Sequence, residues 1–125
     1  MRSLEQLREK ASLMSNYLEL KAGNQPENII ERLELLSIML IQSGECLAEA
    51  KYYQDQIIHG EITKALTEAY YDKLSATVIK EFVRATAKDF NYLVTMFDRI
   101  NSACVHQIDS LRSVLSFIKA QTLIN

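Results

Sequence analysis

One apolar step of three or four residues repeats from Ile79 to Ile118, and no other pattern in this chain is as regular. The members of this stripe are Ile79, Phe82, Thr86, Phe90, Leu93, Phe97, Ile100, Cys104, Ile108, Leu111, Leu115 and Ile118. Their mean spacing of about 3.5 residues lies between a coiled-coil seam and a straight α-helix. Neither proline nor glycine interrupts the segment, so we expect one helix over residues 75–121, about 70 Å long, which needs a partner along its whole length.

The preceding residues predict two more helices joined by a tight turn. The first is expected over residues 3–22, with Ser3 as its N-cap. Its apolar positions follow the same three- and four-residue spacing: Leu4, Leu7, Ala11, Met14 and Leu18. Gly23 is expected to end this helix and Pro26 to open the next, which we expect over residues 26–72.

The second helix has two distinctive parts. Residues 29–41 are apolar nearly all round, and such a helix must be covered on more than one side. We therefore expect the first helix to fold back along this half. Further on, we expect a kink or a break at Gly60, because glycine inside a helix costs about 1 kcal/mol relative to alanine.

These elements predict an all-α fold in a single domain over residues 1–125. The expected architecture is an antiparallel helical hairpin of two long helices, with the shorter N-terminal helix packed on its base. This is a three-helix bundle of coiled-coil type. Three glycines and one proline are too few for the turns of a sheet, so we expect no strands.

A turn near Lys73 brings opposite charges on the two long helices into register. The expected pairs are Glu27 with Lys119, Glu34 with Arg112, Glu49 with Arg99, Glu61 with Lys88 and Glu68 with Lys80. Each exposed pair contributes only about 0 to 1 kcal/mol, so we expect these pairs to fix register rather than stability. The same register brings Cys46 near Cys104, beside Ser43 and Gly44, where we expect a layer of small residues and closely approaching backbones.

Composition limits the cellular compartment and the class of partner that we expect for this chain. The net charge is −2, so no overall electrostatic attraction draws the chain to nucleic acid or to an anionic membrane. The densest apolar stretch, residues 35–41, is far shorter than the roughly 20 residues that span a bilayer, and the chain opens directly into a charged helical pattern without a signal core. We expect no membrane contact. With two cysteines, both in helical patterns, we expect a cytoplasmic protein.

No catalytic, cofactor or metal constellation is present in the sequence. Cys104 and His106 are two residues apart on a helix, so they point to nearly opposite faces and cannot hold one ion together. We interpret them as a core thiol and a surface imidazole, and His59 as a residue near a helix end. Neither histidine follows a glutamate by three residues, as a di-iron bundle site requires. We therefore expect no enzyme, no cofactor and no metal.

A row of basic residues on the third helix offers one candidate surface. Basic side chains beside tyrosines hold single-stranded nucleic acid through phosphate contacts and base stacking. The candidate contacts are Lys73, Lys80, Arg84, Lys88, Tyr52 and Tyr70. The alternative is that these lysines pair with Glu61 and Glu68 and that the tyrosines pack at the edge of the core.

Aromatic residues gather in the middle of the chain, where the first helix is not expected to reach. Two helices alone cannot bury both faces, so we expect a homo-oligomer, most simply a dimer, formed through this distal half. The candidate interface residues are Tyr53, Tyr71, Phe82, Phe90 and Tyr92.

The closing third of the chain resembles uncharacterised small helical proteins carried by phages and mobile elements of gut Bacteroidetes. The residues that carry this resemblance are Asn91-Tyr92-Leu93, Arg99-Ile100-Asn101, Cys104-Val105-His106-Gln107-Ile108-Asp109 and Leu111-Arg112-Ser113. It implies a phage or mobile-element origin and no activity. In size and layout the chain is also similar to phage recombination mediators of the UvsY type, which bind single-stranded DNA. We therefore expect a non-enzymatic helical interaction or scaffold module that self-associates and docks another protein; the alternative is a single-stranded-DNA-binding accessory protein of phage recombination.

Overall fold

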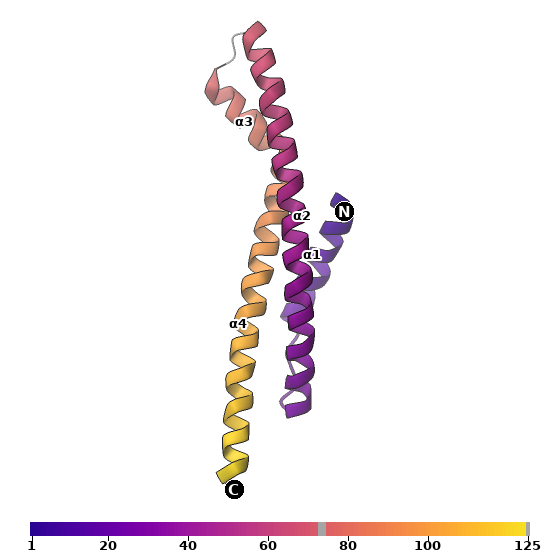
Figure 1. The fold of residues 1–125 in the computed structure, drawn as a ribbon, viewed down its shortest axis with the longest axis vertical. Helices are drawn as coiled ribbons and strands as arrows, with labels where there is room; N and C mark the ends of the chain where they lie inside the picture. Colours follow the sequence, from indigo (N-terminus) through magenta and orange to yellow (C-terminus); the bar gives the residue numbers. More distant parts are fainter. Residues whose placement is uncertain (73–74, 125) are drawn as a thin grey trace.

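The part of the chain that the structure describes is all-α, as predicted, but it forms four helices instead of three (Figure 1). A computed structural model describes residues 1–72 and 75–124, without the side chains of Ile62, Ala65, Leu66, residues 68–72, Thr86 and Ile124. The elements in order are α1 (Leu4–Glu19), α2 (Pro26–Asp72), α3 (Ala76–Thr86) and α4 (Lys88–Ile124). No strand occurs in these described residues. In Figure 1, α4 lies alongside α2 in the opposite direction and extends past its start.

Helix α1 begins as predicted and ends earlier. Ser3 is its N-cap: the Ser3 hydroxyl accepts a hydrogen bond from the Gln6 amide, and the Gln6 side chain accepts one from the Ser3 amide. The helix ends at Glu19 because Leu20 turns to an extended backbone, so Gly23 is not its cap. Gly23 instead allows a close approach, since a Cβ there would lie 2.3 Å from the Asn28 side chain.

The expected break at Gly60 is absent, because α2 continues through this residue to Asp72. A single glycine weakens a helix but keeps its N–H and C=O groups, so the ladder of hydrogen bonds can pass through it. Around and after Gly60, two threonine hydroxyls donate hydrogen bonds to backbone carbonyls one turn earlier in the helix. Thr63 donates to the His59 carbonyl at 2.9 Å, and Thr67 donates to the Thr63 carbonyl at 3.0 Å.

The single helix expected over residues 75–121 is also wrong, because it is divided at Ala87. Ser75 caps α3 as expected, accepting a hydrogen bond from the Val78 amide at 3.3 Å. The buried position at the division lies one residue later than predicted. Ala87, which follows Thr86 of the predicted stripe, is 1% exposed, whereas Phe82 of that stripe is 48% exposed. One straight helix cannot bury both this face and that of α4, so the division lets each segment turn its own apolar side toward α2.

The core lies where α1, α2 and α4 meet, which we call the proximal region. Its buried residues are Leu7, Ala11, Met14, Leu36, Cys46, Ala50, Leu93, Phe97, Ile100, Cys104 and Ile108. The predicted small-residue layer is present in part, since Ser43, Cys46 and Cys104 are fully buried. Gly44 does not mark a close backbone approach, because a Cβ there would meet nothing within 4 Å.

Polar contacts between α2 and α4 set their register close to the predicted one. The Ser43 hydroxyl donates to the Asn101 side-chain oxygen, and the Gln54 amide donates to the Asn91 side-chain oxygen. The predicted pair of Glu49 with Arg99 is not formed. Glu49 instead accepts from Arg2 at 3.1 Å, because α1 places that guanidinium against α2.

Helix α1 lies further along the molecule than expected. Tyr53 donates its hydroxyl to the Arg2 carbonyl at 2.9 Å, and at the other end of α1 the Gln107 amide donates to the Leu18 carbonyl at 3.0 Å. The expectation that this helix covers residues 29–41 is therefore wrong in part. Four large apolar side chains of that segment stay exposed: Ile30, Leu35, Ile38 and Ile41. Beyond Gln54, α2 packs with α3, and we call α3 with residues 55–72 the distal region.

Candidate functional site

An open groove runs between α2 and α4 in the proximal region. Its lining residues are Ile30, Leu33, Glu34, Ser37, Ile38, Ile108 and Arg112, around a volume of about 490 Å³. The apolar surface continues one turn further on each helix, to Ile41, which is 66% exposed, and to Val105, which is 44% exposed. We call this surface, from Ile30 to Ile41 and from Val105 to Arg112, the α2/α4 groove.

The α2/α4 groove faces away from α1. Arg32 lies against α1, with its guanidinium carbon 4.2 Å from the centre of the Tyr17 ring. Ile30 and Glu34 are two residues to either side of Arg32, and residues two apart on a helix point to nearly opposite sides. The covered side of α2 is therefore occupied by α1, while the groove on the other side has no helix of the described chain over it.

The groove carries one charge of each sign. Glu34 and Arg112, predicted to pair across the two long helices, both line it. Among the side chains that the structure describes, the ion pairs are those of Arg2 with Glu45 and Glu49 and of Arg8 with Asp89. The Glu34 and Arg112 charges are thus both present on an apolar surface without an ion-pair partner in the described chain.

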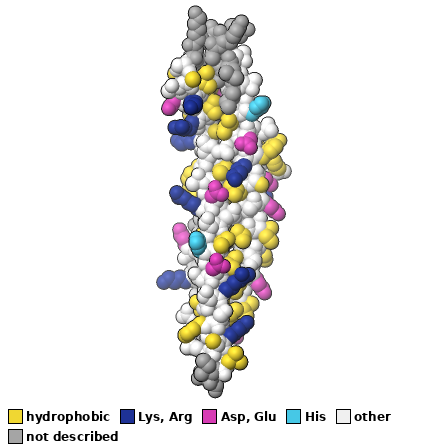
Figure 2. Space-filling view, turned by 60° about the vertical axis from the view of Figure 1, so that its left-hand side comes forward, with side chains coloured by type: hydrophobic (Ala, Val, Ile, Leu, Met, Phe, Trp, Pro, Cys, Tyr) yellow, Lys and Arg dark blue, Asp and Glu magenta, His cyan; other side chains and the backbone are white. Residues whose placement is uncertain are grey.

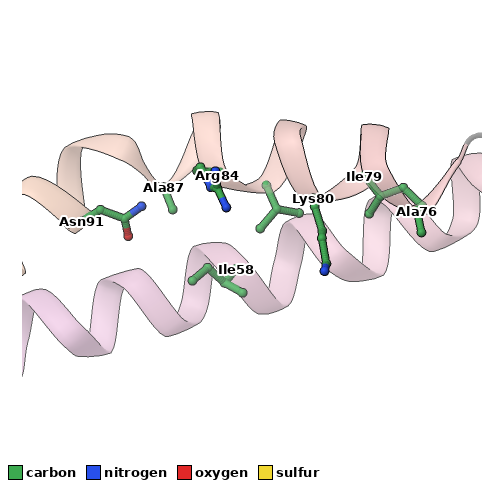
Figure 3. A pocket seen from close by; sticks show the side chains of 8 residues that line it. Ile58, Ala76, Ile79, Lys80, Arg84, Ala87 and Asn91 are labelled. Carbon is green, nitrogen blue, oxygen red and sulfur yellow. The ribbon is translucent and has the colours of Figure 1, made fainter.

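The predicted basic row runs from Lys80 and Arg84 in the distal region to Lys88 at the start of α4, beside a second hollow. Lys80 and Arg84 line it with the apolar residues Ile58, Ala76, Ile79, Val83 and Ala87 and with Asn91, around about 610 Å³. Figure 3 shows Lys80 and Arg84 projecting from α3 toward α2, with Ile58 opposite them. Within the described side chains no ion pair joins Lys80, Arg84 or Lys88 to a carboxylate, including Glu61. Lys73, Tyr70 and Glu68 lie outside the described side chains.

The predicted interface aromatics are divided between the interior and the surface. The Tyr53 ring stacks on Phe90, with ring centres 5.1 Å apart, so this pair is engaged within the chain. Tyr92 is 63% exposed, and Phe82 keeps about half of its surface. Tyr52, a candidate stacking residue, is half exposed and meets Tyr53 edge to face. Tyr71 lies outside the described side chains.

Both cysteines and His106 occupy the positions that the spacing predicted, whereas the expectation that His59 lies near a helix end is wrong, because α2 continues past it to Asp72. Cys46 and Cys104 are free thiols in the core, and desolvation by burial raises the pKa of both, so neither is an activated nucleophile. His106 and His59 lie at the surface. Within residues 1–72 and 75–124, the described side chains form no group of three or more metal-ligating residues. No helix among the described residues is long and apolar enough to cross a bilayer.

Sequence reasoning missed the α2/α4 groove because it assigned α1 to the wrong stretch of α2. The signal was present, since residues 29–41 have more apolar sides than one short helix can cover. Figure 2 shows hydrophobic side chains in patches along the molecule between charged ones, with Lys and Arg side chains near the upper end. Comparison with known proteins found no match among family models, curated proteins or solved structures.

Proposed function

We propose that this protein is a non-enzymatic helical interaction module that self-associates through the α2/α4 groove. The observation that carries the proposal is the uncovered apolar side of α2, on which Ile38 and Ile41 are 54% and 66% exposed. Apolar surface of this extent, with charges at its edge, is typical of protein–protein interaction sites. We therefore still propose a dimer, but we place its interface at the α2/α4 groove instead of at the distal aromatic residues.

The amount of exposed surface supports a partner. The chain exposes 8788 Å², whereas a compact monomer of its mass, 14.3 kDa, exposes about 6,800 Å². The excess of roughly 2,000 Å² is as large as the total area buried in a standard-size protein interface. Association of two copies would bring two α2/α4 pairs together as four long helices with coiled-coil-like packing.

Charge complementarity favours a second copy as the occupant. In a twofold symmetric interface the same surface meets itself, so a contact between two different residues occurs twice, once in each direction. Glu34 lies on one wall of the groove and Arg112 on the other, so two groove surfaces related by a twofold axis parallel to the helices pair Glu34 of each copy with the partner's Arg112. The apolar residues between them supply the buried centre.

Light scattering coupled to size exclusion tests this assembly. We expect a molar mass of twice 14.3 kDa for the wild-type chain. Ile38→Asp and Ile41→Asp should each raise the dissociation constant at least about tenfold, because each buries an unpaired carboxylate in the interface. Leu13→Asp is the matched control, since Leu13 is 59% exposed on the outer side of α1. A wild-type monomer at every concentration, or equal disruption by Leu13→Asp, contradicts the proposal.

A charge reversal tests the symmetric pairing separately. Glu34→Arg and Arg112→Glu should each weaken association several-fold, because each places two like charges at the same contact. The double variant restores opposite charges and should recover wild-type association. Failure of the double variant to recover would leave the groove as the interface but reject this pairing.

The second candidate function is binding of single-stranded nucleic acid by the distal region. The basic row Lys80, Arg84 and Lys88 favours it, because these charges have no ion pair within the described side chains. Three phosphate contacts predict a slope of about −2 for the logarithm of the binding constant against the logarithm of salt concentration.

Fluorescence anisotropy with a labelled oligonucleotide separates the two functions. We expect no binding under the first proposal, and salt-sensitive binding under the second that is lost when Lys80, Arg84 and Lys88 become Glu. The control replaces three other exposed basic residues, Lys51, Arg99 and Lys119, by Glu and so changes the net charge equally. Equal loss in both triple variants would indicate a general charge effect rather than a site.

Two further parts of the proposal rest on the sequence. A phage or mobile-element origin is supported by the resemblance of the closing third of the chain. A reducing cytoplasm is the compartment we propose, since both thiols are free and buried.

A further inference from the structure

A buried guanidinium without a carboxylate partner stands out in the proximal region. Arg32 is only 7% exposed, and arginine is almost never this buried unless its charge is paired. No carboxylate in the described side chains forms an ion pair with it. Its Nε is buried and has no hydrogen-bond partner among the described residues.

The contacts of Arg32 hold its side chain in one orientation. The guanidinium lies over the Tyr17 ring, and its Nη2 donates to the Gln107 side-chain oxygen at 2.9 Å. Gln107 is itself fixed, because its amide donates to the Leu18 carbonyl. These partners orient the guanidinium but are neutral, so they leave its positive charge uncompensated.

Arg32 lines a hollow that has further cationic and hydrogen-bonding groups. The hollow is about 530 Å³ and lies where the end of α1 and the following loop meet α4. Its other polar lining residues are Glu19, Lys21, His106, Gln107 and Ser110, and its apolar ones are Leu18, Leu20, Ala22 and Leu111. Arg32 and Lys21 each contribute a positive charge and Glu19 a negative one, so these three residues give the lining a formal excess of one positive charge.

We propose that this hollow, which we call the Arg32 pocket, binds a small organic carboxylate with an apolar body. A monoanion matches the single excess positive charge, and a carboxylate matches the fork of guanidinium donors. The leucine side chains accept the apolar body, and the volume falls within the range of small-molecule sites. This site faces α1, so it is separate from the α2/α4 groove and does not depend on self-association.

NMR titration of the ¹⁵N-labelled full chain with benzoate at pH 7 tests the Arg32 pocket. We expect saturable shifts of the Gln107 side-chain amide and of the Ser110 backbone amide, with a dissociation constant on the order of 1 mM, as for small ligands. Arg32→Lys keeps the charge but loses the fork, and should weaken binding about tenfold. Absence of saturable shifts at these two groups would overturn the proposal.

Variants outside the core keep the test independent of folding. Lys21→Glu alters an exposed loop residue and should weaken benzoate binding several-fold with an unchanged melting temperature. Arg112→Gln removes a positive charge from α4, the helix that carries Gln107 and Ser110, at a position outside the pocket. It should leave benzoate binding unchanged. Equal weakening by both variants would show only general charge attraction. Inorganic phosphate is the comparison ligand, and tighter binding of phosphate than of benzoate would reject a carboxylate site.

Discussion

The proximal and distal regions share one long helix, α2, but differ in what packs against it. In the proximal region α1 and α4 both contact α2, and Phe97, Leu36 and Leu7 are completely buried. Among the described residues of the distal region, α3 is the helix that packs on α2, and Val78 and Phe82 keep about half of their surface exposed. Both regions carry similar apolar residues at helical spacing. The third helix, rather than the pattern, therefore decides which of them form a core.

Replacing one phenylalanine in each region should give the largest difference in stability. Phe97→Ala leaves a cavity where the ring is 0% exposed, and we expect the free energy of unfolding to fall by about 3 to 5 kcal/mol. Phe82→Ala removes a ring that is 48% exposed, and we expect a loss of about 1 kcal/mol. Urea denaturation followed by circular dichroism measures both. Equal losses would show that the distal region is as well packed as the proximal one.

The two buried thiols should make the stability of the proximal region depend on pH. Burial raises the pKa of Cys46 and Cys104, so the neutral thiol is the form that the fold favours. This contribution is fully present below the unfolded pKa of about 8.5, and it is lost as pH rises through the higher native values. We expect the free energy of unfolding to fall above about pH 8.5, with a slope of at most about 1.4 kcal/mol per pH unit for each thiol, because the unfolded chain releases a proton that the native chain retains.

Comparing how steeply the free energy of unfolding falls with pH in the wild type and in a variant without thiols separates this effect from the titration of other groups at alkaline pH. The variant Cys46→Ala/Cys104→Ala should lose less stability between about pH 8 and pH 10 than the wild type, whatever its stability at neutral pH. Chemical denaturation at each pH gives the two curves. Parallel curves would mean that the thiols are already solvated in the native state.

Helical periodicity predicted the class of fold and most helix limits, because a 3.6-residue period follows directly from side-chain spacing. It did not predict which neighbour covers each face. The apolar excess of residues 29–41 places α1 against that segment, yet the contacts of α1 reach from Arg32 to Tyr53. The division at Ala87 has no glycine or proline to mark it, since it follows from the different neighbours of α3 and α4.

The Arg32 pocket was missed for a related reason. Arg32 lies three residues after Ile29 and four before Leu36, so its spacing placed it on the buried side of α2. Sequence alone does not reveal whether a cation at such a position is paired, because its partners, Tyr17 and Gln107, come from two other helices. The one sign of this site in the sequence was the position of Arg32 on the apolar stripe of α2.

Alanine in place of each helical glycine should strengthen both regions by similar, smaller amounts. Gly60 lies in the distal region and Gly44 in the proximal one, and a Cβ at either position would meet nothing within 4 Å. We expect each substitution to raise the free energy of unfolding by about 0.5 to 1 kcal/mol, because alanine loses less backbone entropy in a helix. Thermal denaturation measures this gain. A loss of stability for Gly60→Ala would show that α2 needs glycine there after all.

The smallest expected effect lies at the boundary between the two regions, where Arg8 of α1 pairs with Asp89 at the start of α4 at 3.1 Å. Both side chains are more than half exposed, so water and salt screen the pair, and we expect Arg8→Ala to cost no more than about 0.5 kcal/mol. Arg2→Ala should cost more, because Glu49 is only 19% exposed and would keep a partly buried charge without its partner. Urea denaturation at low and at high salt distinguishes them, since salt should remove the Arg8 effect and leave most of the Arg2 effect. If the two costs were equal and equally sensitive to salt, α1 would be held to the proximal region by apolar packing alone.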